Sequence, residues 1–212
     1  MKMKTIVFTV VLAMFTYKNI LFASTVEEII SKKEGKVFYD EQTDLTWMKC
    51  SLGQVWTGVR CTGEPKKYEW QEAINEAKQF IYAGYADWRL PTRMELHSLV
   101  NCSTGRRPIE LDADGKTLKV NGEWMDGGCL GYKYISPTIN SNVFLDTPAE
   151  FYWSSTLVSD DSVYAWGIDF GFGQDYYGFR FAHYNVRFVR SGQLLKASSS
   201  EASKKIKIQN SK

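Results

Sequence analysis

The sequence lacks the motifs on which most enzyme families depend, and it is poor in histidine. The G-x-S-x-G, H-E-x-x-H and G-x-x-x-x-G-K patterns, which position a nucleophilic serine, a catalytic zinc ion and a nucleotide phosphate, are all missing. Only His97 and His183 could act as a base for Ser154 or Ser155, and no supporting motif surrounds either serine. We therefore expect ordinary strand serines and predict a protein that is not an enzyme and holds no cofactor or metal.

The chain has one long apolar run, at its N-terminus, and no second one. Lys2 and Lys4 precede an apolar run of ten residues over Ile6 to Phe15, and Leu21-Phe22-Ala23 then ends in a small residue. This pattern is typical of a secretory signal peptide, and its apolar part is too short to span a bilayer comfortably. We predict a signal peptide over residues 1–23, with an uncleaved N-terminal anchor as the alternative. The mature protein is then exported, to the periplasm, the cell surface or the medium, and has no transmembrane segment.

Without the signal peptide, the chain has no large excess of basic or of acidic side chains. The mature chain keeps 23 basic and 24 acidic side chains, a formal charge of −1. A nearly neutral chain lacks the general attraction for phosphate that nucleic-acid-binding proteins show, so we expect no nucleic-acid partner. Residues 24–35 are expected to form a lead-in, either a short helix or a charged stretch, and residues 36–192 one domain. Residues 193–212, rich in Ser and Lys, are expected to be a flexible tail.

The four cysteines do not have the spacing of a zinc or redox site. Cys50, Cys61, Cys102 and Cys129 are separated by 10, 40 and 26 residues, whereas zinc knuckles and redox motifs use close C-x-x-C pairs. In an exported chain, an even number of cysteines indicates disulfides. Three pairings are possible. We favour Cys50 with Cys61 and Cys102 with Cys129, because each pair brackets a loop-rich segment.

Strand patterns are found on both sides of a helical region. The predicted strands are rich in β-branched and aromatic residues: they are 37–39, 45–48, 151–155, 163–170, 176–181 and 186–190, with a further hairpin over 117–124. In the strand 163–170, Tyr164, Trp166, Ile168 and Phe170 alternate with smaller or polar residues and are expected to share one face.

Two helices are predicted between these groups of strands. Over residues 68–81 apolar residues recur at steps of three and four, with Ile81 the last of them and Gly84 placed to end the helix. Thr92-Arg93-Met94-Glu95 then matches a capping box, and the apolar residues after it give the second helix a buried face. We predict an α+β fold in which two helices pack on small antiparallel sheets, with a long loop region between them and the last strands.

Four strings, taken in order, resemble one known family. They are Gly84 to Thr92 (GYADWRLPT) followed by Glu95-Leu96, Tyr152 to Thr156 (YWSST), Ala165 to Phe170 (AWGIDF) and Val186 to Arg190 (VRFVR). In order and spacing they resemble the Lcl C-terminal domain family, long described only as a domain of unknown function, over about residues 36–192. The resemblance implies an exported bacterial module, since the namesake is the C-terminal domain of a collagen-like adhesin that binds sulfated glycosaminoglycans.

Part of this pattern is also similar to the formylglycine-generating enzymes. The strings Arg89-Leu90-Pro91-Thr92 and Val186 to Arg190 carry that similarity, which implies a C-type-lectin-like fold. Those enzymes oxidise their substrate with two cysteines late in the domain, whereas the last cysteine here is Cys129, so the activity does not carry over. The chain also has no Gly-X-Y collagen repeat, so the trimer that such a stalk imposes is not implied.

Three further patterns have a structural explanation beside the functional one. Asp112-Ala113-Asp114-Gly115 resembles the start of a calcium loop, but Lys116 follows it and the rest of the pattern fails, so we expect a turn. Gly171-Phe172-Gly173 lacks the third glycine of a dinucleotide-binding loop and is expected to be a hairpin turn. Glu95 and Asp87 could form an acid–base pair, but the capping box and a turn explain them.

Aromatic and basic residues outside the expected core are the candidate ligand-binding residues. Between Phe151 and Arg190 lie 13 of the chain's 31 aromatic residues, and most must be core. The candidates are aromatic residues at turns, which are hard to bury, and basic residues clustered in loops. They are Arg106, Arg107, Lys116, Lys119, Phe172, Tyr176, Tyr177 and Tyr184. Solvated loop charge is the alternative for the basic ones. Arg187 and Arg190 are expected to pair with buried acids instead.

These observations leave two binding functions open. The first is an adhesin-like module that recognises an anionic polysaccharide or a host surface. The second is a periplasmic partner of another protein, such as an inhibitor, an immunity protein or an accessory subunit of a surface structure. An enzyme on the same scaffold is a third hypothesis, and for it the sequence offers no site.

Overall fold

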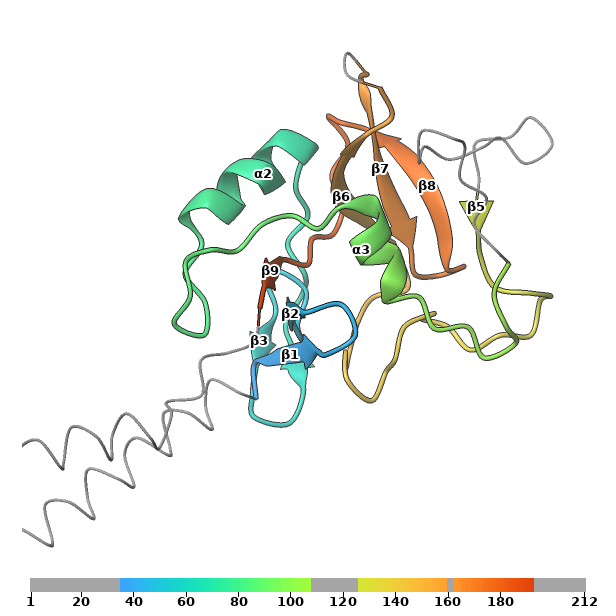
Figure 1. Ribbon diagram of the computed structural model, residues 1–212, viewed down its shortest axis with the longest axis horizontal. Helices are drawn as coiled ribbons and strands as arrows, with labels where there is room; N and C mark the ends of the chain where they lie inside the picture. Colours follow the sequence, from blue (N-terminus) through green and yellow to red (C-terminus); the bar gives the residue numbers. More distant parts are fainter. Residues whose placement is uncertain (1–34, 108–125, 160–161, 193–212) are drawn as a thin grey trace, which may run out of the picture.

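A computed structural model describes residues 35–107, 126–159 and 162–192 (Figure 1). The fold of these residues is α+β, as predicted, with two short helices and small antiparallel sheets. The elements in chain order are β1 (Val37–Asp40), β2 (Leu45–Met48), β3 (Val55–Trp56), β4 (Cys61–Thr62), α2 (Trp70–Gln79), α3 (Arg93–Ser98), β5 (Asp126–Gly127), β6 (Phe151–Leu157), β7 (Tyr164–Asp169), β8 (Gln174–Phe179) and β9 (Val189–Ser191).

Several predictions from the sequence fall outside the described residues. They concern the signal peptide, most of the lead-in, the tail, the hairpin 117–124, the turn at 112–115, and the two lysines Lys116 and Lys119. Within the part of the chain that is described, no helix is long and apolar enough to cross a bilayer.

The two ends of the domain pair with each other in a three-stranded sheet of order β1-β2-β9. Trp47 in β2 lies opposite both Phe38 and Val189, and its side chain is fully buried. The predicted N-terminal hairpin is therefore confirmed. The closing strand was predicted over 186–190, whereas β9 covers Val189–Ser191. The residues before β9 pair instead with the chain after β2, where Leu52 N donates a hydrogen bond to Val186 O at 2.9 Å.

The larger sheet has the order β5-β8-β7-β6 and stands at the other end of the domain from β1, β2 and β9 (Figure 1). The alternation predicted for β7 is present, but both faces of the strand are covered. Ala165 packs into one hydrophobic cluster, whereas Ile168 and Phe170 pack into a second one. Gly167 is required here, because a Cβ would lie 2.2 Å from Tyr152 O. The sheet thus separates two cores.

Helix α2 is shorter than predicted. It ends at Gln79, because Phe80 adopts an extended conformation, in which its ring stacks on Tyr82 and packs edge-on against Phe188. Ile81, which was expected on the buried face, is therefore 73% exposed. Gly84 lies in the turn after the helix and does not end it.

Helix α3 begins as predicted. Glu95 N donates to Thr92 Oγ1 at 3.3 Å, and Thr92 N donates to Glu95 Oε2 at 2.7 Å, so both halves of the capping box are formed. Helix α3 packs on β6 and β7, and its Leu96 side chain is fully buried.

The partners of Arg187 differ from the predicted buried acid. Its side chain is fully buried, but its partners are not acids. Nη1 donates to the carbonyl oxygens of Met48, at 2.7 Å, and of Lys49, and Nη2 donates to Thr147 Oγ1 at 2.7 Å. Burial lowers the pKa of this guanidinium. The cation thus ties the end of β2 to the loop before β6. Arg190 does pair with an acid, Asp87, although that carboxylate is 56% exposed.

Replacing Arg187 should therefore destabilise the domain although no ion pair is lost. Arg187→Met keeps most of the volume but leaves buried oxygen acceptors without donors, at a cost of about 1 to 3 kcal/mol for each group. We expect the free energy of unfolding in urea to fall by at least about 2 kcal/mol. The exposed Arg107 is the matched control, and Arg107→Met should change stability by less than about 0.5 kcal/mol. Equal effects of the two substitutions would contradict this role.

Candidate functional site

Three segments meet at the Cys102–Cys129 disulfide and form one surface. Both disulfides have the predicted pairing, Cys50–Cys61 and Cys102–Cys129. Backbone hydrogen bonds join the segments around the second one: Arg107 N donates to Gly128 O at 2.9 Å, Leu130 N to Gly105 O at 2.9 Å, and Cys129 N to Phe172 O at 3.1 Å. Residues 102–107, 128–138 and 170–173 are thus fixed to one another without long regular elements.

The side chains on these segments give the surface a positive charge. Arg106, Arg107 and Lys133 are exposed, and the three segments contain no acidic residue. Tyr132 is fully exposed and Phe172 is 55% exposed. We call these five residues the basic loop surface. The structure brings together three of the residues predicted from the sequence, Arg106, Arg107 and Phe172.

Lys133 and Tyr132 were missed by the sequence reasoning. Both follow Cys129 within four residues. Their place shortly after a disulfide-bonded cysteine was the signal that could have found them.

A buried charge cluster lies beneath this surface. The Asp175 carboxylate in β8 is fully buried and is bonded by Arg93 Nε and His97 Nδ1, both from α3. Arg93 also stacks on Trp166, 3.6 Å from the ring centroid. The carbonyl of His97 in turn accepts a hydrogen bond of 3.2 Å from Arg106 Nη1. One buried carboxylate therefore connects the helix, the sheet and the basic loop surface.

The same cluster places His97 away from the serines that were considered as nucleophiles. Ser154 Oγ donates to Trp166 O at 2.7 Å, and Ser155 Oγ to Pro91 O at 3.2 Å. Among the described residues, no hydrogen bond joins either serine to a histidine, and His183 is exposed.

The predicted tyrosines divide between two environments. Tyr184 is half-buried, with its ring 4.5 Å from that of Phe151 and 4.9 Å from that of Trp153, so it belongs to the packing of the core. Tyr176 and Tyr177 stack on each other at 5.2 Å.

Tyr176 and Tyr177 begin a continuous row of rings, which we call the aromatic ladder. From Tyr177 the row continues to Tyr164 at 5.2 Å, to Phe179 at a further 4.5 Å, and to Phe181 at a further 5.0 Å. Phe179 is 44% exposed and Phe181 is 65% exposed. The sequence analysis did not single out either phenylalanine, because alternation in a strand does not tell which end of the sheet is covered.

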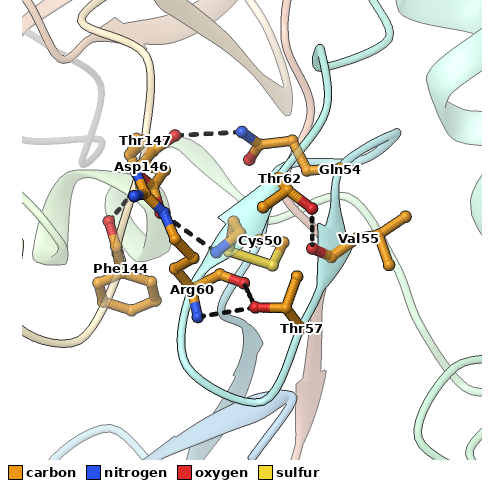
Figure 2. Close-up of polar contacts among 10 residues, drawn as sticks. Cys50, Gln54, Val55, Thr57, Arg60, Thr62, Phe144, Asp146 and Thr147 are labelled. Atoms are coloured by element: carbon orange, nitrogen blue, oxygen red, sulfur yellow. Dashed lines mark hydrogen bonds and ion pairs between the residues drawn. A yellow bond between two sulfur atoms is a disulfide. The ribbon is translucent and has the colours of Figure 1, made fainter.

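A third exposed feature is the short β3–β4 hairpin, which Asp146 holds in place (Figure 2). The Asp146 carboxylate accepts hydrogen bonds from the Arg60 guanidinium and from Cys61 N, and its carbonyl accepts one from Gln54 Nε2. Asp146 has a φ of 56°, a strained value for a residue other than glycine. The hairpin is further tied by the Cys50–Cys61 disulfide. It is thus a rigid projection.

The two carboxylates considered for acid–base chemistry are held in the ionised state. Burial opposes ionisation of Glu95, but hydrogen bonds from Arg89 and Thr92 outweigh it and keep the pKa of Glu95 below its ordinary value. The hydrogen bond from Arg190 lowers the pKa of Asp87 in the same way. Both acids thus form ion pairs, Glu95 with Arg89 and Asp87 with Arg190, and Glu95 also forms the capping box that was expected. Among the described residues, no group of three or more His, Cys, Asp or Glu side chains could hold a metal ion.

The model of one known protein family matches most of the chain. A model of the Lcl C-terminal domain family matches residues 36–190. The chain belongs to this family. The match covers every described strand and helix except the last residue of β9, so the basic loop surface, the aromatic ladder and the hairpin are all parts of the Lcl C-terminal domain. A search of the curated proteins gives no match.

The buried cluster gives a prediction for the Lcl C-terminal domain of this chain. Asp175→Asn removes the charge that Arg93 faces in the interior, and loss of one partner of a buried pair costs about 3 to 5 kcal/mol. We expect the free energy of unfolding to fall by about 3 kcal/mol, measured by urea denaturation with tryptophan fluorescence.

Asp87→Asn is the control, because the Asp87 carboxylate is largely exposed in its pair with Arg190. Such pairs are worth less than about 1 kcal/mol. A loss for Asp175→Asn no greater than that for Asp87→Asn would show that the buried cluster does not hold α3 on the sheet.

Proposed function

We propose that the protein is an exported binding module without catalytic activity that recognises an anionic polysaccharide through the basic loop surface. The observation that carries the proposal is that Arg106, Arg107 and Lys133 are exposed on two segments joined by backbone hydrogen bonds, 102–107 and 128–138, neither of which contains an acidic residue. Arginine forks can bind sulfate or carboxylate groups with two parallel hydrogen bonds. Tyr132 and Phe172 add exposed aromatic area beside these charges.

Export is the compartment that these features support. Two disulfides in a chain of this size fit an oxidising environment, and the basic and apolar N-terminal pattern fits a signal peptide. The periplasm, the cell surface and the medium all satisfy these conditions.

A C-type-lectin-like fold belongs to the same proposal. The paired terminal strands, the two helices on the sheets and the irregular segments between α3 and β6 support it. In such an arrangement the regular elements form a fixed frame, and the loops carry recognition.

Binding to immobilised heparin tests the proposal. The protein should be retained at low salt and eluted by moderate salt, because each exposed ionic contact is weak and screened. Arg106→Ala combined with Arg107→Ala should weaken binding roughly tenfold. Lys66→Ala combined with Lys78→Ala is the matched control, since it removes the same charge from exposed positions elsewhere and should leave retention unchanged.

Two results would overturn the proposal. One is the absence of retention at low salt. The other is an equal weakening by both double substitutions, which would indicate general charge attraction in place of a defined surface.

The β3–β4 hairpin favours a second candidate function, recognition of a partner protein. Val55 is 64% exposed and Val59 is 75% exposed on this rigid projection. Exposed apolar side chains on a fixed element suit a protein interface. This function predicts that one periplasmic protein co-purifies in a 1:1 ratio and is lost with Val55→Ser and Val59→Ser. Its retention by that double variant would exclude the hairpin as the interface.

A further inference from the structure

A shallow pocket of about 250 Å³ lies where α2 begins and β8 ends, apart from the basic loop surface. Its lining residues come from three parts of the chain: they are Glu69, Gln71, Val163, Arg180 and Phe181. The backbone fixes these parts together, since Trp70 N donates to Arg180 O at 2.9 Å and Arg180 N donates to Val163 O at 2.9 Å. The backbone around the pocket is therefore held in place by hydrogen bonds between its three parts.

Arg180 is the best-fixed polar group of the pocket. Its guanidinium lies over the Trp70 ring, 4.5 Å from the centroid, and Nη1 donates to Ser162 O at 3.3 Å. Its Nε is buried and has no hydrogen-bond partner among the described residues. The guanidinium is thus held in place by its contacts with Trp70 and Ser162.

Phe181 gives the pocket an aromatic wall that continues into the aromatic ladder. Its ring stacks on Phe179 with an angle of 24° between the planes. The adjacent Val163 is 57% exposed. The pocket thus lies at the end of the aromatic ladder where Phe179 and Phe181 are exposed.

The chemistry of the lining favours an uncharged polyhydroxylated ligand. One carboxylate, one guanidinium and one amide supply both donors and acceptors without net charge. A hydroxyl group both donates and accepts, so it can use all three, whereas a sulfate would meet the Glu69 carboxylate. The face of an aromatic ring carries negative charge density, which attracts the weakly positive C–H groups on the flat side of a pyranose. The volume is smaller than that of pockets for drug-sized ligands, so it suits one sugar ring.

We propose that this pocket binds a single uncharged pyranose of a glycan, with Phe181 stacked on the sugar and Glu69, Gln71 and Arg180 bonded to its hydroxyls. The aromatic ladder would carry the next sugars of the chain. This site does not depend on the proposed recognition of anionic polysaccharides, because it shares no residue with the basic loop surface.

Titration calorimetry with maltohexaose, cellohexaose, chitohexaose and mannohexaose tests the pocket. At least one of the four should bind, and its affinity should be unchanged in high salt, since no ionic contact is involved. Phe181→Ala should weaken that binding roughly fivefold, because one stacked ring is lost. Ile81→Ala is the control, since this exposed apolar side chain lies outside the pocket, the aromatic ladder and the basic loop surface, and it should have no effect.

The outcomes separate this proposal from the previous one. Binding that survives Arg106→Ala with Arg107→Ala but not Phe181→Ala supports the pocket, whatever the result with heparin. Failure of all four oligosaccharides to bind would overturn it, as would equal binding by the Phe181→Ala variant. Ultracentrifugation is a further test. If it shows a dimer that Phe181→Ala dissociates, the aromatic ladder is the interface with a second copy of this chain, and the proposal is wrong.

Discussion

A single buried carboxylate holds the domain together where its helix, its sheet and its loops meet. Asp175 lies in β8 with no exposed surface and is bonded by two cationic or polar groups of α3, Arg93 and His97. A charge in the interior is tolerated only when it is paired and hydrogen-bonded, so the helix has one permitted position on the sheet. Because Arg106 bonds to the carbonyl of His97, the orientation of the basic loop surface depends on the same carboxylate.

The frame and the recognition surfaces therefore have different chemistry. Inside, cations are bonded to fixed oxygens: Arg187 donates hydrogen bonds to backbone carbonyls, and Arg93 pairs with the Asp175 carboxylate. Outside, at the loops around Cys102–Cys129, three cations lie without an acid in the same segments. The pocket at Phe181 differs from this surface, because charged side chains of both signs, Glu69 and Arg180, line it together with an aromatic ring. We therefore propose an anionic polymer for the first surface and an uncharged sugar for the second.

Local signals were readable from the sequence, whereas tertiary ones were not. The capping box at Thr92 and the alternation in β7 depend on residues within a few positions, and the structure confirms both. The exposure of Ile81 was missed, because the helix is ended by the packing of Phe80 on Phe188, far away in the sequence. Two of the partners of Arg187 are the backbone oxygens of Met48 and Lys49, more than one hundred residues away, and every residue has such a carbonyl, so the sequence does not identify them.

The central claim is that the disulfide-linked loops form one surface for anionic glycans. The most direct measurement is an NMR titration of the 15N-labelled protein with a heparin tetrasaccharide. The account predicts that the amide shifts cluster at Arg106, Arg107, Tyr132, Lys133 and Phe172, on three segments far apart in the sequence. Shifts confined to the β3–β4 hairpin or to the pocket at Phe181, with none at Arg106 and Arg107, would contradict it.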